Sequence, residues 1–157
     1  FNYPEARTRP ADQMLLRTYL DTGRAAAARR MVMDLKAHVE SAPIDTPYLV
    51  DASIAWGDFL YNKEDYRTAV FAFSIAEEAT AGSNLPVTGL RSDPEWARYQ
   101  RANALLQLAD YEGCLSLYEA IAASDSPWAQ EAAVKANLAR LEQRQRGVPL
   151  AQNTPTG

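Results

Sequence analysis

The positions of the nine prolines constrain the fold of this 157-residue chain more than any other feature of its sequence. A proline inside a helix removes a backbone hydrogen bond and clashes with the preceding turn, so prolines usually mark helix ends. Three proline-free stretches remain between clusters of prolines, at 11–42, 48–85 and 95–126. Each is too long for one average helix and long enough for a helical hairpin. We therefore expect three hairpins followed by one last helix.

Turn signals divide each stretch into two helices. They lie at 21–24, 62–65 and 109–111. The predicted helices are, within a few residues, 11–21, 24–41, 47–62, 64–81, 94–109, 111–124 and 127–146. Three starts carry Asp or Ser before a proline at the first helical position, where the side chain can cap the helix and the proline loses no hydrogen bond. These starts are Asp45-Thr46-Pro47, Ser92-Asp93-Pro94 and Asp125-Ser126-Pro127.

The predicted helices belong to a single repeat domain. It spans residues 10–146, with hairpins at about 10–43, 47–81 and 94–124 and a capping helix at 127–146. One long loop, 81–92, separates the second hairpin from the third. The Pro-, Thr- and Gln-containing ends, 1–9 and 147–157, are predicted to be flexible tails.

The composition favours helices over strands and excludes several kinds of partner. Ala contributes 28 residues, whereas Val and Ile together contribute 11. No apolar run is long enough to form a transmembrane segment. The net charge of -4 disfavours a nucleic-acid partner, because binding to phosphates needs a basic face. We therefore predict an all-α protein with no transmembrane segment and no nucleic-acid partner.

The predicted hairpins share a spacing of small and aromatic residues. In the second hairpin Gly57 is followed by Tyr66, Ala69, Phe73 and Ala76, and the last four lie on one helix face. Small residues let two helices approach closely, and a ring fills the space one turn further on. The pattern returns as Tyr111, Cys114, Tyr118 and Ile121 in the third hairpin, and as Ala25, Ala28, Val32 and Leu35 in the first.

This pattern resembles the tetratricopeptide repeat family, in a bacterial form with long repeat spacing. The second hairpin matches the small and aromatic positions of the repeat except that Leu60 replaces one ring. The resemblance covers residues 10–146 and departs from the family in its period, because equivalent positions recur after 41 and then 45 residues rather than 34. It implies a superhelix of three stacked hairpins that binds a protein segment in its concave groove.

A stack of hairpins needs a terminal element whose outer face is polar, and the last helix fits that role. Charged and amide residues are predicted to form its solvent-exposed side, and Trp128 is predicted to pack on the third hairpin. The predicted inner side consists of Ala132, Ala133, Ala136, Leu138, Ala139 and Leu141.

The sequence lacks the features of an enzyme or a metalloprotein. One His and one Cys cannot complete a zinc site of the usual nitrogen and sulfur type. His38 lies late in a predicted helix with no nucleophile motif nearby, and Cys114 occupies a small-residue position where a thiol acts as a small hydrophobe. The acidic pairs lie at helix ends or on solvated faces, and the glycines form no phosphate-binding loop. We predict a non-catalytic protein without cofactor or metal.

The first helices of the hairpins are expected to line the groove. Tyr and Trp side chains there would provide contact area for a bound peptide, and Asn and Gln side chains would fix its orientation. For Tyr99 and Asn103 packing within the fold is an equal alternative, and for Trp96 it is the favoured one. The candidate groove residues are Gln13, Arg17, Asp51, Ile54, Asp58, Tyr61, Asn62, Trp96, Tyr99, Gln100, Asn103 and Gln107.

Family members that bind a carboxyl terminus use a clamp of Lys, Asn and Arg side chains. The corresponding positions here hold Gln13, Arg17, Ala55, Trp96 and Gln100. The clamp is absent, so capture of a terminal carboxylate in that manner is not expected.

The sequence predicts an interaction adaptor whose partner is a protein or peptide segment. Two alternatives remain open: the first hairpin, which carries Met14, Leu15, Met31 and Met33, could stack on another copy to form a homo-oligomer, or the chain could be a fragment of a longer repeat array. The start at Phe1 suggests a processed or truncated product. The use of such repeats in bacterial envelopes favours a periplasmic or envelope-associated location over a cytoplasmic one.

Overall fold

The computed structural model describes residues 5–81 and 93–147, with side chains from Gln13 onward. These residues form α-helices and one short 3-10 helix and contain no strand, so the predicted all-α class is confirmed. The elements are α1 (Glu5–Asp21), α2 (Ala25–Ser41), η1 (Pro43–Asp45), α3 (Thr46–Asn62), α4 (Tyr66–Ala81), α5 (Pro94–Gln107), α6 (Tyr111–Ala122) and α7 (Ala129–Gln145).

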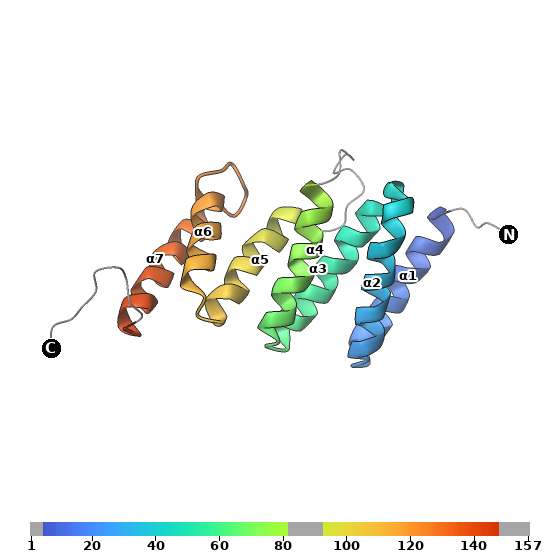
Figure 1. Ribbon diagram of the computed structural model, residues 1–157, viewed down its shortest axis with the longest axis horizontal. Helices are drawn as coiled ribbons and strands as arrows, with labels where there is room; N and C mark the ends of the chain where they lie inside the picture. Colours follow the sequence, from blue (N-terminus) through green and yellow to red (C-terminus); the bar gives the residue numbers. More distant parts are fainter. Residues whose placement is uncertain (1–4, 82–92, 148–157) are drawn as a thin grey trace.

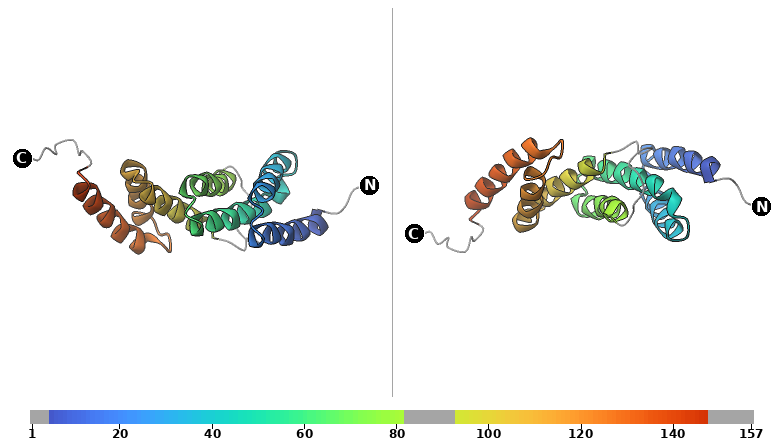
Figure 2. Two further views of the ribbon diagram at one scale, coloured as in Figure 1. Left: turned by 90° about the horizontal axis from the view of Figure 1, so that it is seen from below. Right: turned by 90° about the horizontal axis from the view of Figure 1, so that it is seen from above.

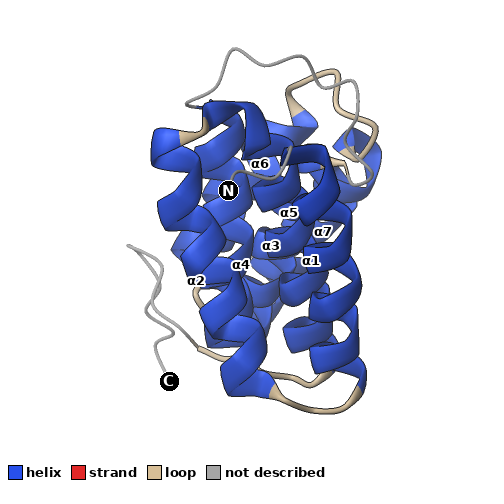
Figure 3. Ribbon diagram, turned by 90° about the vertical axis from the view of Figure 1, so that its right-hand side faces the viewer, coloured by secondary structure: helices blue, strands red, loops and turns tan. Residues whose placement is uncertain are grey.

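The helices follow one another along the long axis of the molecule, so that α1 and α7 lie at opposite ends (Figure 1). Each helix packs against the next, and α3 also packs against α1 and α5. The helices α1 and α3 lie on one side of this part of the array, and α2 and α4 lie on the other (Figures 2 and 3). The described helices therefore form an open array and not a closed bundle.

The same turn joins the two helices of each hairpin. Gly23, Glu64 and Ala109 have left-handed backbone conformations, with φ of 73°, 63° and 60°. The residue after each donates its backbone N–H to a carbonyl five residues earlier, at 2.8 to 2.9 Å. This pattern is the Schellman motif that commonly ends helices. The three left-handed positions lie 41 and then 45 residues apart, which is the repeat period predicted from the sequence.

Replacing Glu64 with glycine is expected to raise the free energy of unfolding by about 0.5 to 1 kcal/mol, because glycine adopts a left-handed conformation without strain. The Glu64 side chain is exposed, so its loss removes no packing. Urea denaturation measures the change. The matched control is Glu78→Gly in α4, where glycine should instead cost about 1 kcal/mol of helix propensity. A loss of stability at both positions would contradict the strain assigned to Glu64.

The core forms two clusters that meet at α5. The first joins α1 to α4 and includes Ala97 and Ala104 of α5, and the second joins α5, α6 and α7. Trp96 packs against both clusters. Within the first cluster α3 and α4 approach so closely that a methyl group added to Gly57 would lie 2.6 Å from Cε1 of Phe73. The small and aromatic positions noted in the sequence are therefore in direct contact.

The start of α1 differs from the prediction. The helix begins at Glu5, so residues 5–9 are helical and do not belong to a tail. Pro10 lies inside α1, where its nitrogen has no hydrogen to donate. The preceding Glu, Ala and Arg residues are strong helix formers, and their propensity explains why the helix extends past the proline. The predicted loop at 82–92 and the ends 1–4 and 148–157 lie outside the described residues.

Asp93 caps α5 as predicted, because its carboxylate accepts the backbone N–H of Glu95 at 2.9 Å. Asp45 does not cap α3, and its carboxylate instead accepts a hydrogen bond from Nε2 of His38 at 2.7 Å. This bond joins the end of α2 to η1 and gives the single histidine a structural partner.

The prediction of the buried face of α7 is partly wrong. Ala132, Ala136 and Ala139 are buried as predicted, but Ala133, Leu138 and Leu141 are exposed. Helical periodicity explains the difference, since the three alanines lie three or four residues apart and leave the leucines on the adjoining face. Trp128 packs on the third hairpin as predicted, with its ring stacked 5.4 Å from that of Tyr99 in α5.

Candidate binding groove

A groove of about 700 Å³ lies between α1 and α3. Its apolar surface comes from both helices, and its polar groups are carboxylates, one guanidinium and one amide. The lining residues are Gln13, Met14, Leu16, Arg17, Leu20 and Asp21 of α1, and Asp51, Ala52, Ile54, Ala55, Asp58 and Phe59 of α3. Gln13, Arg17, Asp51, Asp58 and Ile54 were all projected onto the groove from the sequence.

The groove side of α3 follows from its helical period. Asp51, Ala55 and Asp58 are spaced by four and then three residues, and Ile54 lies beside Ala55. Residues at such spacings share one face of a helix. The other lining residues were not predicted, although continuing the same period along each helix from the predicted residues reaches Leu20, Asp21 and Phe59.

Asp58 is a half-buried carboxylate of the groove. It accepts Nε1–H of Trp96 at 3.0 Å. Burial raises the pKa of Asp58 above its ordinary value, and the side chains of Trp96 and Gln100 offset part of that rise. The indole of Trp96 thereby ties α5 to the groove wall formed by α3.

Three predicted groove residues lie inside the fold. Tyr99, Gln100 and Asn103 are buried, so packing is the arrangement that the structure shows for them. Asn103 donates through Nδ2 to Oε1 of Gln100 at 2.7 Å and accepts the hydroxyl of Tyr118 through Oδ1 at 2.5 Å. Trp128 covers Tyr99. The physical reason is that α6 and Trp128, which precedes α7, pack over the face of α5 that the repeat pattern had assigned to the groove.

A short chain of hydrogen bonds lies behind the groove. It runs from the Tyr118 hydroxyl through Asn103 to Gln100. The Gln100 side chain in turn offsets part of the rise in the pKa of Asp58, which lines the groove. The buried amides are therefore neighbours of a groove carboxylate, although they do not line the groove.

The remaining predicted residues lie beyond this groove. Trp96 is half-buried between the two core clusters. Tyr61 is also half-buried, with its ring edge-to-face with Tyr66 and a centroid distance of 5.1 Å. Asn62 and Gln107 are exposed. None of these four contributes to the lining of the groove between α1 and α3.

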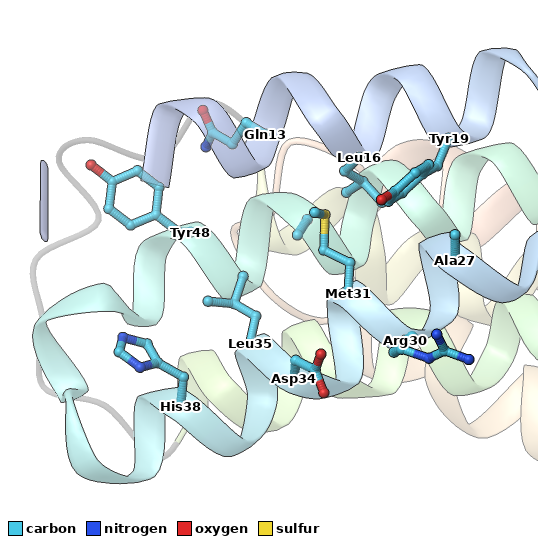
Figure 4. A pocket seen from close by; sticks show the side chains of 11 residues that line it. Gln13, Leu16, Tyr19, Ala27, Arg30, Met31, Asp34, Leu35, His38 and Tyr48 are labelled. Atoms are coloured by element: carbon cyan, nitrogen blue, oxygen red, sulfur yellow. The ribbon is translucent and has the colours of Figure 1, made fainter. Parts of the chain in front are cut away.

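A second cavity, of about 410 Å³, lies between α1, α2 and α3 (Figure 4). Leu16, Tyr19 and Met31 occupy its middle, and His38 and Tyr48 lie near one end. It shares Gln13, Leu16 and Ala52 with the groove, so α1 has open space on both of its flanks. Sequence reasoning did not predict this cavity, because it depends on how far α1 and α2 separate.

Cys114 is buried, and burial raises the pKa of its thiol to about 11. At pH 8 only about one thiol in a thousand is then ionised, and the thiolate is the reactive form. We predict that the native protein reacts with a disulfide reagent at least about a hundredfold more slowly than the unfolded chain. A Cys114→Ala, Ser116→Cys variant, which moves the thiol to an exposed position on α6, should react rapidly when folded. Equal labelling of both folded proteins would contradict the burial of Cys114.

Within 5–81 and 93–147, no group of three His, Cys, Asp or Glu side chains is placed to hold a metal ion. In the same ranges no helix combines the length and the apolar character of a membrane span.

No protein-family model, curated protein or solved structure matches this chain.

Proposed function

We propose that this chain is a non-catalytic adaptor that binds a protein segment in the groove between α1 and α3. The observation that carries the proposal is the groove itself, which is open, has a volume of about 700 Å³ and combines apolar residues with a few polar groups. Volumes and linings of this kind are typical of ligand-binding clefts. Side chains of a bound segment would be buried against Ile54, Leu20 and Phe59, and the polar groups would fix its orientation.

The likeness to tetratricopeptide repeats is part of the proposal. Three observations support it: the common turn in each hairpin, the packing of α3 against both α1 and α5, and the contact of Gly57 with Phe73. In such an array the first helices of successive hairpins lie side by side and leave a surface for partners. The groove occupies that surface.

Selection of peptides from a random phage-displayed library on the folded chain tests the groove. Ala55 is exposed and lines the groove, so Ala55→Trp should block it without disturbing the core. The matched control is Ala37→Trp, at an exposed position of α2 outside both cavities. Selected peptides should lose at least about tenfold in affinity for the first variant and keep their affinity for the second. Peptides that bind both variants equally would overturn the proposal.

Self-association is a second candidate function, favoured by the exposed apolar side chains at the ends of the array. On α1, Met14 is 74% and Leu15 is 41% exposed, whereas Met31 and Met33 pack against the first core cluster. If this function holds, light scattering at micromolar concentration should detect dimers or larger species without a partner, and Leu15→Glu should restore the monomer. A monomer at all concentrations would exclude it.

A further inference from the structure

We propose that the outer face of α7 is a dimer interface, at which α7 of a second copy packs antiparallel along a line of exposed apolar side chains. This surface is distinct from the exposed end of α1, because α1 and α7 lie at opposite ends of the array (Figure 1). The inference goes beyond the proposed function and does not depend on peptide binding in the groove. It is carried by the spacing, the exposure and the flanking charges of the residues on α7.

The apolar line, here called the α7 stripe, consists of Val134, Leu138 and Leu141, which are 67%, 44% and 44% exposed. Spacings of four and then three residues align them along the helix, as the contact positions of a coiled coil are aligned. The buried alanines of α7 lie on the opposite face, and α7 packs on α6. No described helix follows α7 in the array (Figure 1). The α7 stripe therefore faces away from the other described helices.

A second α7 fits this stripe better than the far end of the array does. Among the side chains of α1 from Gln13 onward, the exposed large apolar ones are Met14 and Leu15, and Thr18 one turn later is polar. Two α7 helices packed antiparallel about a twofold axis instead place Leu138 of each copy against Leu141 of the other. An interface of this kind closes after two copies, whereas stacking of α7 on α1 would continue into longer species.

The charges beside the stripe favour the antiparallel orientation. Lys135 and Glu142 flank it on the same side, seven residues apart, and both are partly exposed. In an antiparallel pair Lys135 of each copy lies near Glu142 of the other, which gives two ion pairs across the interface. A parallel pair would place uncharged residues, Gln130 and Asn137, opposite these charges. Glu142 also lies 3.9 Å from the exposed Arg146 of its own chain, and a carboxylate with two oxygens can accept from both partners.

Sedimentation equilibrium of the folded chain, from about 1 to 500 µM, is expected to fit a monomer–dimer equilibrium without larger species. Leu138→Glu should raise the dissociation constant of the dimer at least about tenfold, because it places a charge among apolar side chains. The matched control is Leu108→Glu, at a leucine that is 39% exposed at the end of α5. This control and Leu15→Glu on α1 should dimerise like the parent chain. Thermal unfolding of each variant checks that the fold is kept.

Charge variants test the orientation of the two helices. Lys135→Glu and Glu142→Lys should each raise the dissociation constant about threefold or more, because each puts like charges opposite one another twice. An equimolar mixture of these two variants should associate as tightly as the parent chain, since both pairs across the interface then have opposite charges. Lys36→Glu, at an exposed lysine of α2, is the matched control and should have no effect on the dimer.

Each outcome bears on a different part of the inference. A monomer throughout the concentration range would overturn the interface, whether residues 148–157 of the same chain or another protein then covers the stripe. A dimer that survives Leu138→Glu, or one that Leu15→Glu abolishes, would overturn it as well and would assign self-association to another surface. Single charge variants that dimerise normally, or a mixture that fails to recover, would overturn the antiparallel geometry. Peptide binding in the groove is tested separately by Ala55→Trp, so failure of the interface and failure of the groove are distinguishable.

Discussion

Replacing Gly57 with alanine is expected to lower the free energy of unfolding by about 2 kcal/mol, which overpacking of a close-packed core typically costs. The added methyl group would lie 2.6, 2.8 and 2.9 Å from three ring carbons of Phe73. Phe73 is completely buried, so its ring has no free space into which it can move. Alanine stabilises a helix by about 1 kcal/mol relative to glycine. The predicted loss of stability already includes this gain.

A double-mutant cycle isolates the contact between α3 and α4. Phe73→Leu alone should cost about 1 to 2 kcal/mol, because it leaves a partly filled cavity. In combination with Gly57→Ala the losses should be well below additive, since the smaller side chain makes room for the new methyl group. Urea denaturation of the four proteins gives the coupling energy. If Gly57→Ala stabilises the chain, or if the two losses of stability simply add, then the close approach of α3 and α4 does not explain why residue 57 is a glycine.

The helices were largely predictable because their boundaries depend on residues that are close together in the sequence. Prolines and turn residues located the hairpins, and the left-handed residues Gly23, Glu64 and Ala109 have the spacing that the repeat predicted. The start of α1 at Glu5 was missed because proline was treated as a boundary when strong helix formers precede it. The outer face of α7 was misassigned because Leu138 and Leu141 were placed inside on hydrophobicity alone.

The candidate site was less predictable because it depends on contacts between distant residues. On α3 the helical period placed Asp51, Ile54 and Asp58 on one face, and that face lines the groove between α1 and α3. On α5 the same reasoning assigned Gln100 to an open surface and left packing as an equal alternative for Asn103. The two side chains are hydrogen-bonded to each other, and Asn103 also accepts the hydroxyl of Tyr118 from α6, a partner that sequence spacing within α5 does not reveal.

Replacing Asn103 with leucine is expected to cost about 2 to 4 kcal/mol, the largest effect predicted for a single substitution in this chain. Leucine has the same number and branching of side-chain heavy atoms as asparagine, so it keeps the shape of the side chain and removes its hydrogen-bonding groups. Asn103 accepts the hydroxyl of Tyr118 and donates to Gln100, and all three side chains are buried. Without Asn103 the Tyr118 hydroxyl and the Gln100 carbonyl oxygen lose their partners, and each such buried group costs about 1 to 3 kcal/mol.

Two further variants show whether hydrogen bonding is the cause. Asn62→Leu, at an exposed asparagine of α3, should change stability by no more than about 0.5 kcal/mol. Tyr118→Phe in the Asn103→Leu background removes the unpaired hydroxyl and should recover part of the lost stability, whereas in the parent chain it should be destabilising. A cost below about 1 kcal/mol for Asn103→Leu, or no recovery in the double variant, would mean that the hydrogen bonds of Asn103 contribute little to the fold. Recovery would show that the unpaired hydroxyl of Tyr118 causes part of the loss, and hence that a partner on α6 stabilises the burial of this amide of α5.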